Sequence, residues 1–185
     1  MALRHLKNAI RRRRPRRSAR LYGAAVQAAR NHKWYIEFEV PDTVDGRFDM
    51  LALHLFLLQN RLRDAPGGDA VMQEVLETFV ADMDQNLRQL GIGDPSMGRE
   101  IRAMVEAVHG RFAAYATGLA DTTADGLSMA LARNVYRDGN RDGPAQEALA
   151  AYVRGAAAHL AETPLADILA GRLCLPPDET GGSET

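Results

Sequence analysis

The sequence predicts an all-α fold: a single globular domain of about six to seven helices, preceded by a strongly basic N-terminal arm. Three observations support this prediction. Apolar residues recur at three- and four-residue spacing over most of the chain, which is the pattern of amphipathic helices. No segment sustains the period-two alternation of a half-buried strand. The 185 residues suit one domain with a tail at each end.

A basic arm is expected over residues 1–19. Eleven of the 23 basic residues and none of the 24 acidic residues lie in residues 1–36, which carry +11 while the remaining chain carries −12. Leu3, Leu6 and Ile10 recur at helical spacing among these basic residues. We expect the arm either to be disordered and solvated or to dock as a helix on anionic lipid or RNA. The candidate polyanion or membrane contacts are Arg11, Arg12, Arg13, Arg14, Arg16 and Arg17.

The composition limits which partners and which cellular location we expect for the protein. Few aromatic residues accompany these arginines, so base stacking on single strands has little support, and we expect no DNA partner. The N-terminus lacks the apolar core of a secretory signal, and no run approaches the roughly 20 apolar residues of a membrane span. We therefore expect a cytoplasmic protein in a bacterium, with peripheral contact at the inner membrane through the arm. A mitochondrial transit peptide, leading to the matrix side, is the alternative reading of the arm.

The first helix is expected over residues 21–32, where alanine and leucine share one face. Residues 34–40 are the only strand-like stretch, and a lone strand is not stable. Pro41 ends whatever precedes it, because the residue before a proline disfavours the α region.

A second helix is expected over residues 47–63. Asp42, Thr43 and Asp45 offer side-chain oxygens for its N-cap, where acidic residues also favour the helix dipole. Its buried stripe consists of Phe48, Leu51, Leu55, Leu58 and Leu62. Further apolar residues make the helix apolar nearly all round, which predicts a central position. His54, within this helix, is expected to be a core histidine with satisfied nitrogens rather than a ligand.

A third helix is expected over residues 70–90, and Gly91 lies where a left-handed C-terminal cap is expected. Its inward stripe consists of Val71, Val75, Leu76, Phe79, Val80, Met83, Leu87 and Leu90. Four more helices are expected: from after Ser96 to 119, over 123–136, over 143–161 and over 164–170. The domain would then span residues 20–172, followed by a disordered tail over residues 173–185.

Catalytic, metal and disulfide sites have little support. Cys174 is the only cysteine, which excludes an internal disulfide and a thiolate zinc site. Residues 138–143 match the start of an EF-hand calcium loop, but Leu149 stands where its bidentate glutamate belongs, so calcium binding stays open. Glu106 and His109 have the spacing of di-iron sites, in a single copy only. No nucleophile, base and oxyanion donor come together, so we expect no enzyme, no metal and no cofactor.

Four segments together resemble the ubiquinol–cytochrome c chaperone family. In chain order they are residues 40–50, 79–88, 91–94 with Gly98, and 133–136. The resemblance covers about residues 20–165 and leaves out the arm and the tail. It implies a chaperone or assembly factor that binds newly made cytochrome b during assembly of the ubiquinol–cytochrome c reductase (bc1) complex. It also implies a small protein partner and a position near the ribosome.

The resemblance and the residue pattern together give candidates for partner contact. These are Trp34, Tyr35, Asp42, Asp45, Arg47, Phe48, Asp49, Asp82, Asp84 and Arg88. The aromatic residues could anchor a client or close the core, and the charged residues could contact a partner or form internal caps and ion pairs. The apolar helix over residues 47–63 could likewise be one wall of a client cleft or plain core. The alternative function is ribosome or RNA binding through the basic arm.

Overall fold

A computed structural model describes residues 17–91, 93–121, 125–137 and 143–175. Within these residues the chain forms helices and no strand, which confirms the all-α prediction. The first helix is described from residue 17 to residue 29. The later elements are α2 (Lys33–Ile36), α3 (Val44–Leu62), α4 (Gly68–Gln89), α5 (Asp94–Ala120), α6 (Asp125–Leu131), the π-helix η1 (Ala132–Tyr136), α7 (Pro144–Glu162) and α8 (Leu165–Leu169).

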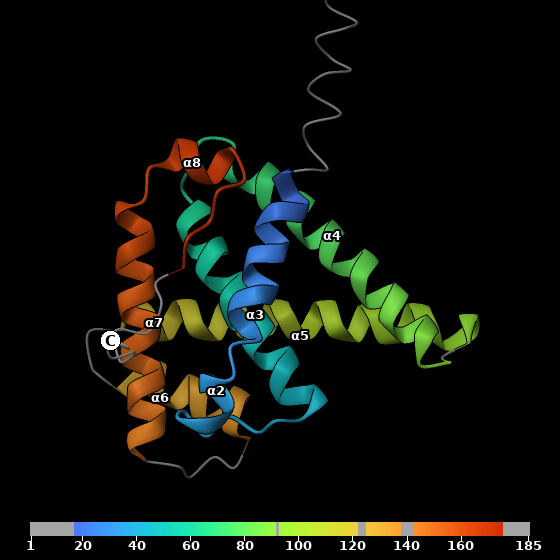
Figure 1. Ribbon diagram of the computed structural model, residues 1–185, viewed down its shortest axis with the longest axis horizontal. Helices are drawn as coiled ribbons and strands as arrows, with labels where there is room; N and C mark the ends of the chain where they lie inside the picture. The colour runs from blue at the N-terminus through green and yellow to red at the C-terminus, as the bar shows by residue number, and fades with distance from the viewer. Residues whose placement is uncertain (1–16, 92, 122–124, 138–142, 176–185) are drawn as a thin grey trace, which may run out of the picture.

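Helix α3 lies at the centre of the molecule. The first helix and α7 lie beside it, and α5 crosses the whole molecule (Figure 1). Residues 52–58 of α3 are all buried, as expected for a helix that is apolar nearly all round. The prediction of a central helix is confirmed, and these residues are core rather than the wall of an open cleft.

Helix α3 begins at Val44, three residues before the predicted start. The cause is an N-cap: the side chain of Thr43 accepts a hydrogen bond of 3.1 Å from the backbone N–H of Gly46. Gly46 is required here, because a Cβ atom would lie 1.9 Å from the carbonyl oxygen of Pro41. The loop before α3 therefore turns so tightly that the backbone of Gly46 packs closely against the backbone of Pro41.

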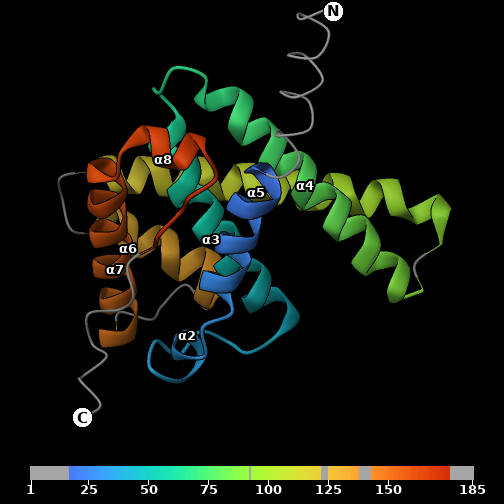
Figure 2. The same ribbon diagram turned by 45° about the horizontal axis from the view of Figure 1, so that its top comes forward.

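Helices α4 and α5 form a hairpin that projects from the rest of the molecule (Figures 1 and 2). Figure 2 shows the two helices converging at their outer tip, where Gly91 has the left-handed φ of 79° that was predicted for it. Leu90 at the same tip has 74% of its surface exposed. The hairpin therefore offers helix surface that the core does not cover.

Predicted boundaries also differ from the observed ones elsewhere: α5, for example, begins at Asp94 and not after Ser96. The helix expected over residues 123–136 is two elements, α6 and the π-helix η1. Residues 17–19, assigned to the arm, belong to the first helix. Leu173 and Leu175, assigned to the tail, pack against the core. Among the described residues, no helix is both long and apolar enough to cross a membrane.

Candidate functional site

A polar cluster with a buried centre and an exposed edge holds the start of α3 against α5 and the end of η1: Asp49 and Arg111 lie inside it, and Asp45 and Arg137 lie at the surface. It consists of Asp45, Asp49, Arg111 and Arg137, and the Asp49 side chain is completely buried. Arg111 Nε donates to Asp49 Oδ1 at 2.9 Å, and Arg137 Nη2 donates to Asp49 Oδ2 at 3.1 Å. Arg137 Nη1 also donates to Asp45 Oδ2 at 2.8 Å. Burial raises the pKa of Asp49, and the two guanidinium groups partly offset that rise.

The backbone at Arg137 is unusual. Its φ of 58° is left-handed, which is uncommon for a residue other than glycine, and it directly follows the π-helix η1. Such a conformation persists when its surroundings hold it, and the two carboxylates of the polar cluster do so. Tyr136, the residue before it, donates its hydroxyl to the carbonyl of Phe38 at 2.7 Å. Arg137, which directly follows segment 133–136, pairs with Asp45 and Asp49 of segment 40–50, so these two family-like segments lie side by side.

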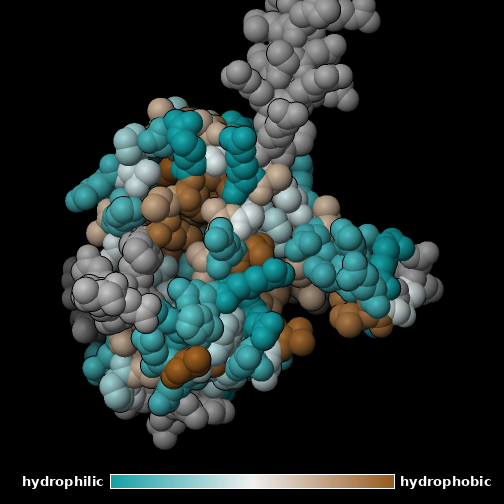
Figure 3. Space-filling view, viewed as in Figure 1, coloured by the Kyte–Doolittle hydropathy of each residue, from teal (hydrophilic) through white to brown (hydrophobic). Residues whose placement is uncertain are grey.

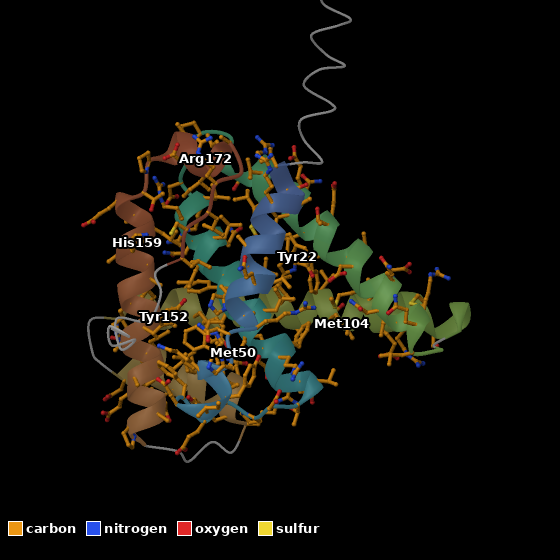
Figure 4. All side chains as sticks on the ribbon, in the orientation of Figure 1. Tyr22, Met50, Met104, Tyr152, His159 and Arg172 are labelled. Carbon is orange, nitrogen blue, oxygen red and sulfur yellow. The ribbon has the colours of Figure 1, made fainter. Side chains whose placement is uncertain are left out.

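Trp34 belongs to the core, with 2% of its surface exposed. Its indole N–H donates to the carbonyl of Ala28 at 2.7 Å, and its ring centroid lies 4.6 Å from that of Tyr152. Tyr152 points inward from α7 (Figure 4) and its hydroxyl lies 3.2 Å from Nε2 of His54. His54 is buried with both nitrogens satisfied, as predicted, because Nδ1 pairs with the carbonyl of Met50 at 2.7 Å. Burial lowers the pKa of His54 to about 4.

Of the ten predicted partner-contact residues, only Trp34 and Asp49 are buried, and the other eight lie at or near the surface. Tyr35 is half-buried, donates its hydroxyl to a backbone carbonyl, and has the Arg47 guanidinium 5.8 Å from its ring centroid. Arg47 also pairs with Asp42 at 2.7 Å, and Arg88 pairs with Asp84 at 2.8 Å one turn away on α4. These exposed pairs contribute little to stability, and their contact with a partner stays a prediction.

Phe48 in segment 40–50 and Asp82 in segment 79–88 contact side chains on neighbouring helices. Phe48 is half-buried; its ring centroid lies 6.4 Å from that of Phe79, and the Arg111 guanidinium lies 5.3 Å from it. Asp82 accepts a hydrogen bond of 2.7 Å from the hydroxyl of Tyr22 on the first helix. Segments 40–50 and 79–88 therefore pack together, with Phe48 positioning α4 relative to the polar cluster.

An apolar groove of about 470 Å³ lies between α4 and α5. We call it the α4–α5 groove. Its apolar lining consists of Met72, Leu76, Phe79 and Val80 from α4 and Val105 and Val108 from α5. Its polar lining consists of Gln59, Asp69, Gln73, Glu77 and His109. The groove thus combines an apolar wall from each helix with two carboxylates.

A second hollow, of about 830 Å³, lies between the first helix, α7 and residues 173–175. Figure 3 shows it as a recessed, partly brown area on the face where the chain runs down from α8. Its lining includes apolar side chains such as Val26 and Leu173, but also Gln27, Arg30 and His32. The α4–α5 groove has the more continuous apolar wall and is the better candidate for an apolar ligand.

The remaining sequence candidates have the following positions. Arg17 donates to Glu74 on α4 at 2.7 Å, so its guanidinium lies against the folded body. Glu106 and His109 are exposed on α5, and no group of three or more potential metal ligands occurs in the described part of the chain. Two candidates lie outside the described residues: the start of the calcium-like loop, and the arm arginines Arg11, Arg12, Arg13, Arg14 and Arg16.

Sequence reasoning missed the α4–α5 groove. The signal was present in α4, where the predicted stripe is too wide for one buried face. Val71 and Val75 face the core and are buried, whereas Leu76 and Val80 on the adjoining face are only half-buried. It also missed Arg111 and Arg137, because partners 62 and 88 residues from Asp49 leave no local pattern.

Comparisons with known proteins identify relatives of the chain. A family model described as ubiquinol-cytochrome C chaperone matches residues 37–175. The crystal structure of the Cbp3 homolog from Brucella abortus superposes with a TM-score of 0.83 at 32% sequence identity. The superposition covers 96% of this chain and 97% of that chain. No curated protein matches the chain.

Proposed function

Because the chain belongs to the ubiquinol–cytochrome c chaperone family, we propose that it binds newly made cytochrome b during assembly of the bc1 complex. Membership of the family implies a role in bc1 assembly and places the chain among chaperones rather than enzymes. The resemblance noted in the sequence is therefore confirmed. The identity of the client and the surface that binds it are our proposal.

The observation that carries the proposal is the α4–α5 groove. A chaperone for a membrane subunit must cover apolar segments that water would otherwise drive to aggregate. A client segment that buries about 100 Å² of apolar surface gains about 2.5 kcal/mol at roughly 25 cal/mol per Å². The groove is formed by two helices, as in proteins that hold an amphipathic helix: Leu76, Val80 and Val105 are partly exposed along it, and Met72, Phe79 and Val108 form its buried floor. We infer that one helix of the client lies along it.

Methionine on the hairpin supports binding to varied apolar sequences. Met72 lies in the floor of the groove with 3% of its surface exposed, and Met83 and Met104 are half-buried on the same two helices, outside the groove lining. Methionine is unbranched and polarizable, so it repacks against partners of different shape. A chaperone that must accept client segments of more than one shape benefits from this adaptability.

The polar cluster positions the groove rather than touching the client. Asp49 is completely buried, so it has no surface to offer a partner. Through Arg111 and Arg137 it anchors the start of α3, and Phe48 one residue earlier contacts Phe79 of α4. We infer that this chain of contacts sets the angle at which α4 leaves the core. The family-like segments are then needed to shape the groove.

Gene deletion and complementation test the function in cells. We expect deletion to lower the amount of bc1 complex and the haem b absorbance of membranes, and the wild-type gene to restore both. A matched variant, Leu76→Asp in the groove, should complement poorly, whereas Leu90→Asp at the exposed hairpin tip should complement normally. Unchanged bc1 levels and haem b spectra after deletion contradict the proposal.

Ribosome or RNA contact through the basic arm remains the alternative function, and residues 1–16 lie outside the described part of the chain. Its support is the charge of +11 over residues 1–36. A cytoplasmic location, peripheral contact with the inner membrane and a small protein partner also remain predictions. Salt-sensitive RNA binding that is lost on deleting residues 1–16, without any capture of cytochrome b, would favour the ribosome or RNA alternative.

A further inference from the structure

The N-terminal arm and helix α4 carry opposite charges. Helix α4 has five acidic residues and one arginine, a net charge of −4. Residues 1–16 have seven basic residues and no acidic residue. Two of the α4 carboxylates, Asp69 and Glu77, line the α4–α5 groove. The most basic segment of the chain therefore has an acidic counterpart on the same molecule.

The arm leaves the folded body beside this acidic helix. Arg17 Nη2 donates to Glu74 of α4 at 2.7 Å, and its Nη1 donates to the carbonyl of Leu169 at 3.5 Å. Glu74 lies between Gln73 and Glu77, which line the groove. The ion pair thus fixes the root of the arm within one helical turn of the groove.

The arm is long enough to reach the groove. Ile10 precedes Arg17 by seven residues, which span at most about 23 to 25 Å when extended. Crossing one helix takes about 10 to 12 Å. A path from Glu74 across α4 to the near edge of the groove therefore lies within reach of Ile10.

The arm also carries apolar and basic side chains, which match the apolar wall and the carboxylates of the groove. Leu3, Leu6 and Ile10 recur at helical spacing, with basic residues between them. An amphipathic segment of this kind can place its apolar side chains against the groove wall and its basic side chains near Asp69 and Glu77. The larger hollow beside residues 173–175 suits the arm less well, because Arg30 and His32 line it.

We propose that the arm occupies the α4–α5 groove of its own chain and competes there with the client. This inference rests on the proposed function, because it names a regulator of the same site. The arm acts as an intramolecular substitute for the client, held by the apolar contacts of Leu3, Leu6 and Ile10 and by carboxylate–arginine attraction. High salt weakens the contact because it screens the exposed charges.

Disulfide trapping in the full-length chain tests the contact. In a Cys174→Ala background, Ile10→Cys is combined with Gln73→Cys in the groove lining. Two control pairs combine Ile10→Cys with Ala81→Cys, which lies elsewhere on α4, or with Ala151→Cys on α7; both control sites are exposed. We expect the intramolecular 10–73 disulfide to form at least tenfold faster than either control at low salt. The rate should fall severalfold in 0.5 M NaCl and in the Asp69→Asn, Glu77→Gln double variant.

Three outcomes overturn the inference: equal rates for the three pairs, a rate that ignores the two carboxylates, or a disulfide formed only between two copies. Cytochrome b made by cell-free translation then separates this inference from the proposed function. If the 10–73 disulfide forms and blocks capture, both stand. If it forms and capture continues unchanged, the arm docks but the client binds elsewhere, so the groove proposal and the competition between arm and client both fail. If it does not form and capture occurs at the groove, only the arm inference fails.

Discussion

Asp49 on α3 and Arg111 on α5 form a buried ion pair, with Arg111 Nε 2.9 Å from Asp49 Oδ1. Arg137 supplies a second guanidinium to the other carboxylate oxygen at 3.1 Å. Two of the family-like segments, residues 40–50 and 133–136, lie at or beside this cluster. The relationship explains why a carboxylate can be completely buried: its burial is offset by two cations that α5 and η1 position.

Breaking this pair from one side should be costly. We expect Asp49→Asn to lower the free energy of unfolding by about 3 kcal/mol, because it leaves the largely buried Arg111 guanidinium without its counter-ion. The double variant Asp49→Leu, Arg111→Met should recover much of that loss. Asp84→Asn, which breaks the exposed pair with Arg88, should cost about 0.5 kcal/mol or less. Urea unfolding of the four proteins checks this, and equal losses for Asp49→Asn and Asp84→Asn would contradict it.

Gly46 and Gly155 should respond oppositely to alanine. A Cβ at Gly46 would meet the Pro41 carbonyl oxygen at 1.9 Å, whereas a Cβ at Gly155 on α7 meets nothing within 4 Å. We expect Gly46→Ala to destabilise by about 3 kcal/mol or more, as for other large steric conflicts. Gly155→Ala should stabilise by about 0.5 to 1 kcal/mol through helix propensity. Thermal unfolding distinguishes them, and a tolerated Gly46→Ala would show that the loop before α3 is not tight.

His54 should make stability fall in mild acid. Burial lowers its folded pKa to about 4, against an ordinary value of 6.5. Between these pH values the unfolded chain binds a proton that the folded chain does not, so the free energy of unfolding falls as pH is lowered. The loss should total about 3 kcal/mol over the window and be absent above pH 6.5.

The variant His54→Gln isolates this effect, since it keeps hydrogen-bonding groups but does not titrate. Urea unfolding at pH 7 and pH 4.5 should show a smaller pH dependence in the variant than in the wild type. The raised pKa of Asp49 acts in the opposite direction, but it is common to both proteins and cancels in the comparison. The same pH dependence in both would contradict the assignment to His54.

Polar substitution in the groove should weaken client capture without unfolding the protein. We expect Leu76→Asp to lower the affinity for cytochrome b at least tenfold, because it places a charge on the apolar wall. Leu90→Asp at the exposed hairpin tip is the matched control and should change affinity little. Co-purification with the client is the measurement, and a thermal unfolding transition shows that each variant is folded. Equal capture by both variants would place the client elsewhere.

The sequence predicted what short-range patterns encode. Apolar periodicity predicts where the helices lie and that α3 is central. The preference of glycine for the left-handed region at a helix C-terminus predicts the conformation of Gly91. Such patterns cannot reveal contacts between distant residues. Trp34 was a candidate anchor for a client, yet its indole lies in the core against Tyr152 of α7. The segment before Arg137 is a π-helix where the sequence predicts an ordinary α-helix, because apolar spacing does not distinguish a single π-helical turn from an α-helical one.

The candidate site was predictable only in part. Segments 40–50 and 79–88 were recognised, and Phe48 does connect them to one another through Phe79. The groove itself depends on the angle between α4 and α5, which no periodicity specifies. When the apolar stripe of a helix is wider than the face that the core buries, as on α4, the sequence indicates that part of the stripe lines a groove.

Photocrosslinking from the groove tests the central claim most directly. A photoreactive amino acid at Gln73, in the groove lining, is compared in cells with the same group at Ala151, exposed on α7. Captured proteins are identified by mass spectrometry. We expect Gln73 to capture newly made cytochrome b and Ala151 not to capture it. Failure to capture cytochrome b from Gln73, or equal capture from both positions, would contradict the assignment of the α4–α5 groove as the client-binding site.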